Sequence, residues 1–162
     1  MNKILNIEQA IKLSKQLRDG GKKVVVVGGC FDIVHAGHVT FLENAKQQAD
    51  FLFVLLESDE TIRDTKGENR PIHIQMDRAK VLAALSIIDY VVILHQLKTN
   101  NEYDTLLSKL KPTIIATTKG DPNRTHKERQ AKLINAKMID VMERIENKST
   151  SRLAKLLAGE NF

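Results

Sequence analysis

Five short, largely apolar runs constrain the fold of this chain more than any other feature. The first is Val24–Val27, four consecutive β-branched residues, and the others lie at 51–56, 90–94, 113–116 and 138–142. Continuous apolar runs of this length are typical of strands that are buried on both faces of a sheet. The sequence therefore predicts a five-stranded sheet that is covered on both sides.

Helical periodicity fills most of the segments between these runs. We expect a leading helix within residues 1–20, a polar loop at 57–74, and further helices at about 37–48, 75–86, 102–110, 127–135 and 149–157. Strands that alternate with helices form βα units, and right-handed crossovers build them into a parallel sheet. The prediction is an α/β chain, a single doubly wound, Rossmann-like domain over residues 1–162, with a five-stranded parallel sheet and helices on both faces.

Composition narrows the class of protein. The chain has 42% hydrophobic and 28% charged residues, which is typical of a folded soluble domain. No apolar stretch approaches the roughly 20 residues that a membrane span needs. Cys30 is the one cysteine, so no intramolecular disulfide can form. We therefore expect a cytoplasmic protein without a membrane partner.

The charge balance favours an anionic small molecule as the ligand. There are 25 Lys and Arg residues against 20 Asp and Glu residues, a formal net charge of +5. Nucleic acid is an unlikely partner because aromatic residues make up only 4% of the chain and Trp is absent, so base-stacking surfaces are scarce. Retention on DNA at about 0.15 M salt would test that alternative.

The segment after the first apolar run carries the clearest functional signal. Gly28 and Gly29 let the backbone approach a ligand, and the following helix start offers free N–H groups, so we interpret this loop as a phosphate seat. It is neither the dinucleotide-binding glycine pattern nor the P-loop. His35 and His38 lie three residues apart at the helix start, so both rings can reach one anion. Two capping histidines, or a zinc site that includes Cys30, are the alternatives.

Residues 29–38 read Gly-Cys-Phe-Asp-Ile-Val-His-Ala-Gly-His. This resembles the Gly-x-Phe-Asp-x-x-His-x-Gly-His signature of the cytidylyltransferase-like nucleotidyltransferases. The whole chain is most similar to the adenylyltransferase domain of bacterial heptose-phosphate enzymes, with glycerol-phosphate cytidylyltransferases and archaeal FAD synthetases as relatives. The resemblance implies that the phosphate of an acceptor attacks the α-phosphorus of a nucleoside triphosphate (NTP) and releases pyrophosphate. Mg²⁺ would accompany the NTP as the cofactor.

The same resemblance implies roles for residues along the chain. Those implied to be catalytic, by stabilising the transition state and neutralising the reacting phosphates, are His35, His38, Lys66 and Arg78. Those implied to bind the nucleotide are Gly28, Gly29, Cys30, Phe31, His35, His38, Lys119, Asp121, Arg144, Ser149, Thr150 and Ser151. Those implied to bind the acceptor are Asp32, Lys46, Asp59, Lys66 and Arg70. Taken alone, the three hydroxyl residues could be helix caps, and the basic residues of 57–74 could be a solvated surface.

Two departures from the family pattern bear on the substrates. Residues 144–151 are similar to the cytidylyltransferase form of the triphosphate-binding motif, whereas 85–89 lack the Arg-Tyr-Val-Asp run of those enzymes. In addition, 117–121 read Thr-Thr-Lys-Gly-Asp where heptose enzymes usually show Lys-Gly-Gly-Asp. We expect ATP and heptose 1-phosphate as substrates. CTP-dependent transfer to glycerol 3-phosphate, transfer to FMN, and a catalytically silent nucleotide-binding module are the alternatives.

The length of the chain and its resemblance to heptose enzymes bear on its protein partners. Heptose enzymes often carry a sugar kinase on the same chain, and 162 residues leave no room for one. We therefore expect any kinase to be a separate protein. A homodimer is compatible with the sequence.

Overall fold

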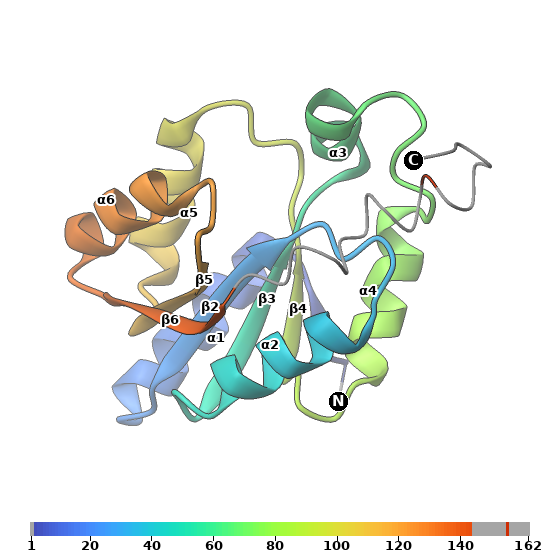
Figure 1. Cartoon of the computed structure of the whole chain (residues 1–162). Coiled ribbons are helices and arrows are strands. Elements are labelled where there is room, and N and C mark those ends of the chain that lie inside the picture. Colours follow the sequence, from blue (N-terminus) through green and yellow to red (C-terminus); the bar gives the residue numbers. More distant parts are fainter. Residues whose placement is uncertain (1, 144–154, 156–162) are drawn as a thin grey trace.

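The protein is described by a computed structural model that covers residues 2–143 and Lys155. Its strands form one parallel sheet in the order β1-β4-β3-β2-β5-β6 (Figure 1). The strands are β1 (Ile4–Leu5), β2 (Val24–Gly29), β3 (Phe51–Leu56), β4 (Tyr90–Ile93), β5 (Ile114–Lys119) and β6 (Lys137–Glu143).

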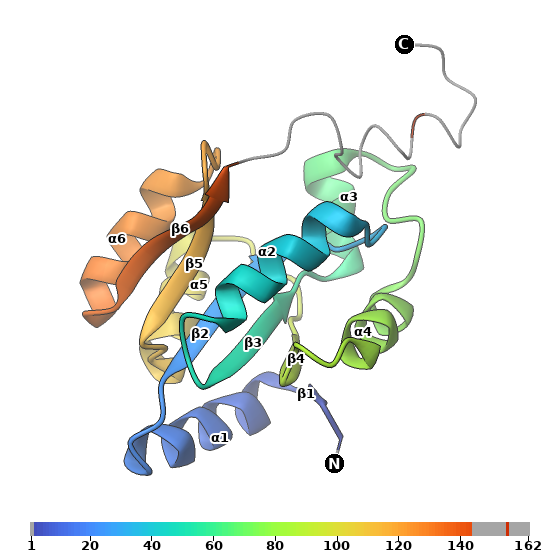
Figure 2. The ribbon, with the colours of Figure 1, turned by 60° about the horizontal axis from the view of Figure 1, so that its bottom comes forward.

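Helices cover both faces of the sheet. Figure 2 shows α1 and α2 on opposite sides of the strands. The helices of the described chain are α1 (Ile7–Asp19), α2 (Ala36–Lys46), α3 (Asp59–Lys66), α4 (Gln75–Ala84), α5 (Asn100–Leu110) and α6 (Arg124–Ile134). The α/β, Rossmann-like class expected from the sequence is confirmed.

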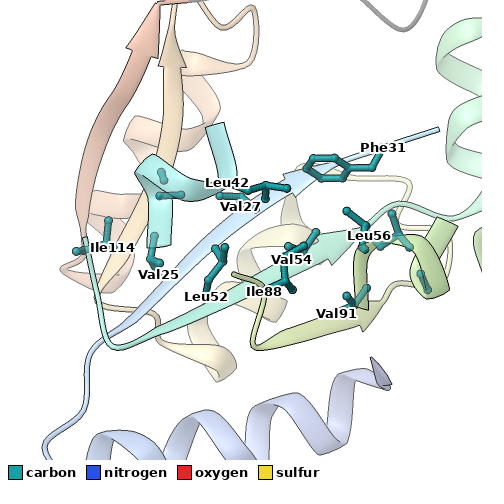
Figure 3. Packing of buried hydrophobic residues seen from close by; sticks show 14 residues of the cluster. Val25, Val27, Phe31, Leu42, Leu52, Val54, Leu56, Ile88, Val91 and Ile114 are labelled. Carbon is teal, nitrogen blue, oxygen red and sulfur yellow. The ribbon is translucent and has the colours of Figure 1, made fainter. Parts of the chain in front are cut away.

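The central strands bury alternate side chains on the two faces. Val25 and Val27 of β2 join a cluster with Leu42 of α2 and Leu82 of α4 (Figure 3). Val24 and Val26 of the same strand join a second cluster, together with residues of α1, α5 and α6. Burial on both faces is therefore confirmed for the run at Val24–Val27, whereas the run at 138–142, in β6, has no buried residue.

The strand order reverses between β2 and β5. β2 pairs with β3 along its whole length on one side, and Val25 and Val26 pair with Ile114 and Ile115 of β5 on the other. In open parallel sheets, ligands bind beyond the carboxyl ends of the strands at such a reversal. The loops that follow β2, β3 and β5 therefore surround the candidate site.

The sheet has six strands, so the prediction of five was wrong. The missed strand, β1, consists of two residues that pair with Val91 and Val92 of β4 at the sheet edge. The backbone N–H of Val91 also donates to the carbonyl of Lys3, at 2.8 Å. Two residues are too few to show a hydrophobic period, and these lie directly before a long amphipathic helix that dominates the local pattern.

The segment predicted as a polar loop, 57–74, contains α3. Ser58 caps this helix by accepting a hydrogen bond from the Thr61 N–H at 3.1 Å, and Asp59 and Glu60 occupy its first turn. Ile62 is its one buried residue, so the segment shows no apolar stripe. Figure 1 shows α3 beyond the carboxyl end of β3, at the edge where the candidate site lies.

Two expectations can be compared with the described residues only. The helix expected at 149–157 lies outside the described residues, apart from Lys155, which is helical. Within the described residues, no helix is long and apolar enough to cross a bilayer.

Gly28 and Gly29 should differ sharply in their tolerance of a side chain. A Cβ at Gly29 would lie 2.9 Å from Cε2 of Phe31, whose ring is held in the core, whereas a Cβ at Gly28 meets nothing within 4 Å. Overpacking a core contact costs typically about 1–3 kcal/mol, so we expect Gly29→Ala to lower the free energy of unfolding by that amount. Gly28→Ala is the matched control and should leave it nearly unchanged. Equal effects in urea denaturation would contradict this account of the loop.

Candidate active site

The loop after β2 is anchored to the hydrophobic core by Phe31. Phe31 adopts a left-handed backbone conformation, with φ 46°, and its side chain is buried beside α2. Its ring lies against the backbone of Gly29, which explains why that position has no side chain. The expected nucleotide-binding loop therefore has one anchored face, and Gly28 on the strand end is exposed.

Asp32 connects this loop to the segment before α4. Its carboxylate accepts hydrogen bonds from Arg70 Nε at 2.8 Å, from the Ile72 N–H at 2.8 Å and from the His73 N–H at 2.9 Å. Burial alone would raise the pKa of Asp32, but these bonds outweigh it and hold the pKa below its usual value. The side chain is completely buried. The structure thus makes Asp32 a support of the loop, and the acceptor contact expected for it stays a prediction.

The two histidines lie together at the start of α2. His35 is the N-cap, and its Nδ1 accepts a hydrogen bond from the Gly37 N–H at 3.1 Å. The rings of His35 and His38 stack with centroids 3.9 Å apart, and the ring of Phe31 lies 5.2 Å from that of His38. His35 therefore caps the helix and also lies against His38, and the contact of both rings with one anion stays a prediction. Because Nδ1 of His35 accepts a bond, the neutral ring carries its proton on Nε2.

The electrostatic surroundings keep His38 neutral. Burial, and then the positive charges of His35 and Lys66, lower the pKa of His38 to about 4, although a hydrogen bond with the Ile33 backbone opposes this. At neutral pH the ring is therefore an uncharged hydrogen-bond donor and acceptor. An anion beside it would favour the protonated form.

This lowered pKa predicts a pH-dependent contribution to stability. Between pH 6.5 and about 4 the unfolded chain protonates His38 while the folded protein does not, so stability falls as the pH drops through this window. The loss due to this ring should be about 2 kcal/mol between pH 6.5 and 4.5. Urea denaturation at both pH values should show a smaller loss for His38→Gln than for the unmodified protein. His126→Gln, at an exposed position of α6, is the control and should keep the full loss.

Arg78 is buried under the site and all of its nitrogens are bonded. Its side chain is inaccessible to solvent. Nη1 donates to the Cys30 carbonyl at 2.6 Å, and Nη2 donates to the Glu57 carbonyl at 2.9 Å and to the Asp59 carboxylate at 2.7 Å. Nε donates to the His73 carbonyl at 3.0 Å. Arg78 thus connects the loops around the site, and its catalytic contact stays a prediction. Asp59, expected to bind the acceptor, is the carboxylate that pairs with it.

Lys66 and Arg70, both expected to bind the acceptor, bring positive charge to the segment between β3 and α4. Lys66 is the last residue of α3, is exposed, and is close enough to lower the pKa of His38 and to act on Cys30. Arg70 is 7% exposed, and within the described part of the chain its Nη2 atom is buried without a hydrogen-bond partner. Buried donors are normally satisfied, so this N–H group is a candidate contact for a ligand.

Sequence reasoning missed Glu57 and Tyr103. Tyr103 of α5 donates its hydroxyl to the Glu57 carboxylate, at 3.0 and 2.9 Å from the two oxygens. Burial raises the pKa of Glu57, while the Tyr103 bond and the charge of Arg78 oppose the rise. Burial and the Glu57 charge raise the pKa of Tyr103. A carboxylate directly after the apolar run at 51–56 was the available signal, but its tyrosine partner lies 46 positions away.

The loop after β5 is organised by Asp121. This carboxylate accepts bonds from Thr117 Oγ1 at 2.6 Å, from Lys127 Nζ at 2.6 Å and from the Asn123 N–H at 2.7 Å. Lys119 is exposed and lies 3.1 Å from Glu143. The structure thus places Lys119 at the last position of β5 and Asp121 in the loop that follows, where Lys127 pairs with Asp121.

Lys46 is not brought to the site. It ends α2, and its ammonium group pairs with Asp89 at 2.7 Å and also donates to the Asp50 carbonyl. Asp89 accepts as well from the N–H of Leu52, which places this pair at the amino end of β3, opposite to the histidines. The length of α2 thus separates Lys46 from the histidines, and its acceptor contact stays a prediction. The four other expected residues that follow β6, Arg144, Ser149, Thr150 and Ser151, lie outside the described residues.

Several known proteins are similar to this chain. The Bifunctional protein HldE of Wolinella succinogenes is 38% identical over 157 residues, which cover 97% of this chain and 31% of that protein. The protein of the same name from Campylobacter curvus is 40% identical over 154 residues, 95% of this chain and 31% of that protein. The chain thus spans about a third of the length of these curated relatives.

Solved structures share the fold. The lipopolysaccharide core biosynthesis protein from Thermoplasma volcanium superposes with a TM-score of 0.65 at 24% identity, over 77% of this chain and 100% of that one. A pantoate-beta-alanine ligase from Francisella tularensis gives a TM-score of 0.64 at 16% identity, over 98% and 80% of the two chains. The family model described as cytidylyltransferase-like matches residues 26–156. The histidine pair, the strand reversal beside it and this match together lead to one conclusion: the chain belongs to the cytidylyltransferase-like family.

Proposed function

We propose that this protein is a nucleotidyltransferase that moves a nucleoside monophosphate from an NTP to a phosphorylated sugar. The phosphate of the acceptor attacks the α-phosphorus, and the bond to the leaving pyrophosphate breaks. ATP and heptose 1-phosphate are the proposed substrates. The observation that carries this proposal is the stacked pair of His35 and His38 at the N-terminus of α2, beside the exposed Gly28 backbone.

The histidines suit the stabilisation of developing charge. The neutral His35 ring can donate its Nε2–H, and His38 gains a second N–H when an anion favours its protonated form. The N-terminus of α2 adds its positive dipole end. Charge on the α-phosphoryl oxygens grows as the phosphorus becomes five-coordinate, so donors fixed in advance act most strongly in the transition state. The capping bond of His35 and the stacking of the two rings fix these donors before substrate arrives.

Countercharge lets two anionic substrates meet. Lys66 and the unpartnered N–H of Arg70 lie on the β3 side of the histidines, where we place the acceptor phosphate. The NTP lies on the β5 side, near Lys119. The acceptor phosphate is largely ionised near neutral pH, so the reaction requires no general base to activate it.

Mg²⁺ would supply charge neutralisation on the triphosphate. Among residues 2–143 no three His, Cys, Asp or Glu side chains gather as a metal-binding group. The described chain therefore does not fit a cage for this ion, which commonly binds through substrate phosphates and water. We propose that it enters with the NTP and is held by the phosphates.

Substrate identity follows from a matrix of the four NTPs with heptose 1-phosphate, glycerol 3-phosphate and FMN, read by pyrophosphate release. We expect ATP with heptose 1-phosphate to be fastest, because residues 85–89 lack the cytidylyltransferase run. A preference for CTP with glycerol 3-phosphate would replace both substrates and would agree with the form of residues 144–151. Absence of release from every pair would contradict the activity itself.

His38→Ala should reduce kcat far more than it weakens nucleotide binding. A donor aimed at developing charge is worth roughly 10²–10³ in rate, and nucleotide affinity by calorimetry should change by less than about tenfold. Circular dichroism should show the fold retained. His126→Ala on α6 is the control and should keep full turnover. Normal turnover in His38→Ala would remove the main support for the proposal.

A further inference from the structure

Glu57 stands at the carboxyl edge of the sheet beside the phosphate loop. It follows β3 on the face that carries Phe53 and Leu55, since side chains alternate along a strand. Its N–H donates to the Gly29 carbonyl at 3.1 Å, and its carbonyl accepts from Arg78. The backbone on both sides of this carboxylate is therefore held in place.

The carboxylate itself is only partly used. A carboxylate offers about four acceptor positions, whereas Tyr103 supplies a single proton. Across residues 2–143, no other donor and no cation pairs with the Glu57 side chain. A half-buried anion costs free energy unless it is well paired, and a purely structural contact between β3 and α5 could be made by apolar side chains. The remaining acceptor positions suit ligand O–H groups.

The charge distribution decides which part of a ligand fits here. A phosphate would be repelled by the Glu57 carboxylate and attracted to Lys66 and Arg70. Hydroxyl groups are uncharged donors, and two neighbouring hydroxyls can bind one carboxylate. An acceptor whose phosphate lies at Lys66 and the histidines would thus direct its hydroxylated carbons towards Glu57.

Both substrates carry hydroxyls, and topology favours the acceptor. The strand reversal, where a nucleotide is expected, lies between β2 and β5, whereas Glu57 follows β3 on the other side of β2. We propose that Glu57, oriented by the Tyr103 hydroxyl, binds hydroxyl groups of the phosphorylated acceptor and determines its specificity for polyols. This rests on the proposed function, which supplies the acceptor.

Calorimetry with α,β-methylene-ATP present tests the proposal without requiring turnover. The probes are heptose 1-phosphate, glycerol 3-phosphate and propyl phosphate, which has the phosphate and no hydroxyls. We expect the hydroxylated probe that binds best to lose about tenfold or more in affinity to Glu57→Gln, while propyl phosphate binds equally well or better. Tyr103→Phe should cause a smaller loss of the same kind.

Asp104→Asn is the matched control. Asp104 is the next residue of α5 and binds Arg129 of α6 at 2.6 and 2.8 Å, so its replacement loosens α5 without touching Glu57. We expect it to leave probe affinities unchanged. The same loss in Asp104→Asn as in Glu57→Gln would show that placement of α5 is responsible, and would overturn the proposal.

The remaining outcomes separate this proposal from the proposed function. Equal weakening of all three probes by Glu57→Gln, no weakening, or weaker binding of the ATP analogue instead would each overturn the hydroxyl site. If none of the probes binds the unmodified protein, the hydroxyl site and the proposed function both fail. Selective loss of the hydroxylated probes, in a protein that releases no pyrophosphate, would uphold the hydroxyl site and reject the transferase activity.

Discussion

The buried guanidinium of Arg78 is the interaction on which the rest of the site depends. It joins the loop after β2, the start of α3 and the turn before α4 by donating to three carbonyls and one carboxylate. Burying a cation is costly, and the cost is offset only when its N–H groups are all well bonded. The loops must therefore take these positions together, because displacement of one would leave both a buried charge and backbone carbonyls without partners.

Around this cation, supporting charges and contacting charges are separated. Asp32 pairs with Arg70 and with backbone N–H groups, and Asp59 pairs with Arg78. Lys66 is left exposed, the histidine rings are partly exposed, and one buried N–H of Arg70 has no partner among the described residues. The lowered pKa of His38 belongs to the same arrangement, since burial in the first place, and nearby positive charge in the second, make a further proton unfavourable.

The sequence predicted the layered fold because a strand that is buried on both faces shows a continuous apolar run, such as Val24–Val27. It predicted the loop after β2 because Gly29, His35 and His38 lie close together in the chain. It could not predict β1, which is defined by pairing with β4, or α3, which is held by a cap and one buried residue. It also could not show that Asp32 and Arg78 are buried and bonded to neighbouring loops, because the same residue types serve as ligand contacts when exposed and as supports when buried.

What the sequence determined by itself was the alternation of the longer strands with helices, the family signature and most of the polar residues near strand ends, all of which depend on local spacing. Only the tertiary structure decided which of these residues meet. Glu57 and Tyr103 come together because α5 packs on the face of the sheet to which Glu57 of the β3 end belongs. Lys46 lies apart from His35 and His38 because it is at the other end of α2. Such contacts depend on distances across the fold, which residue spacing along the chain does not encode.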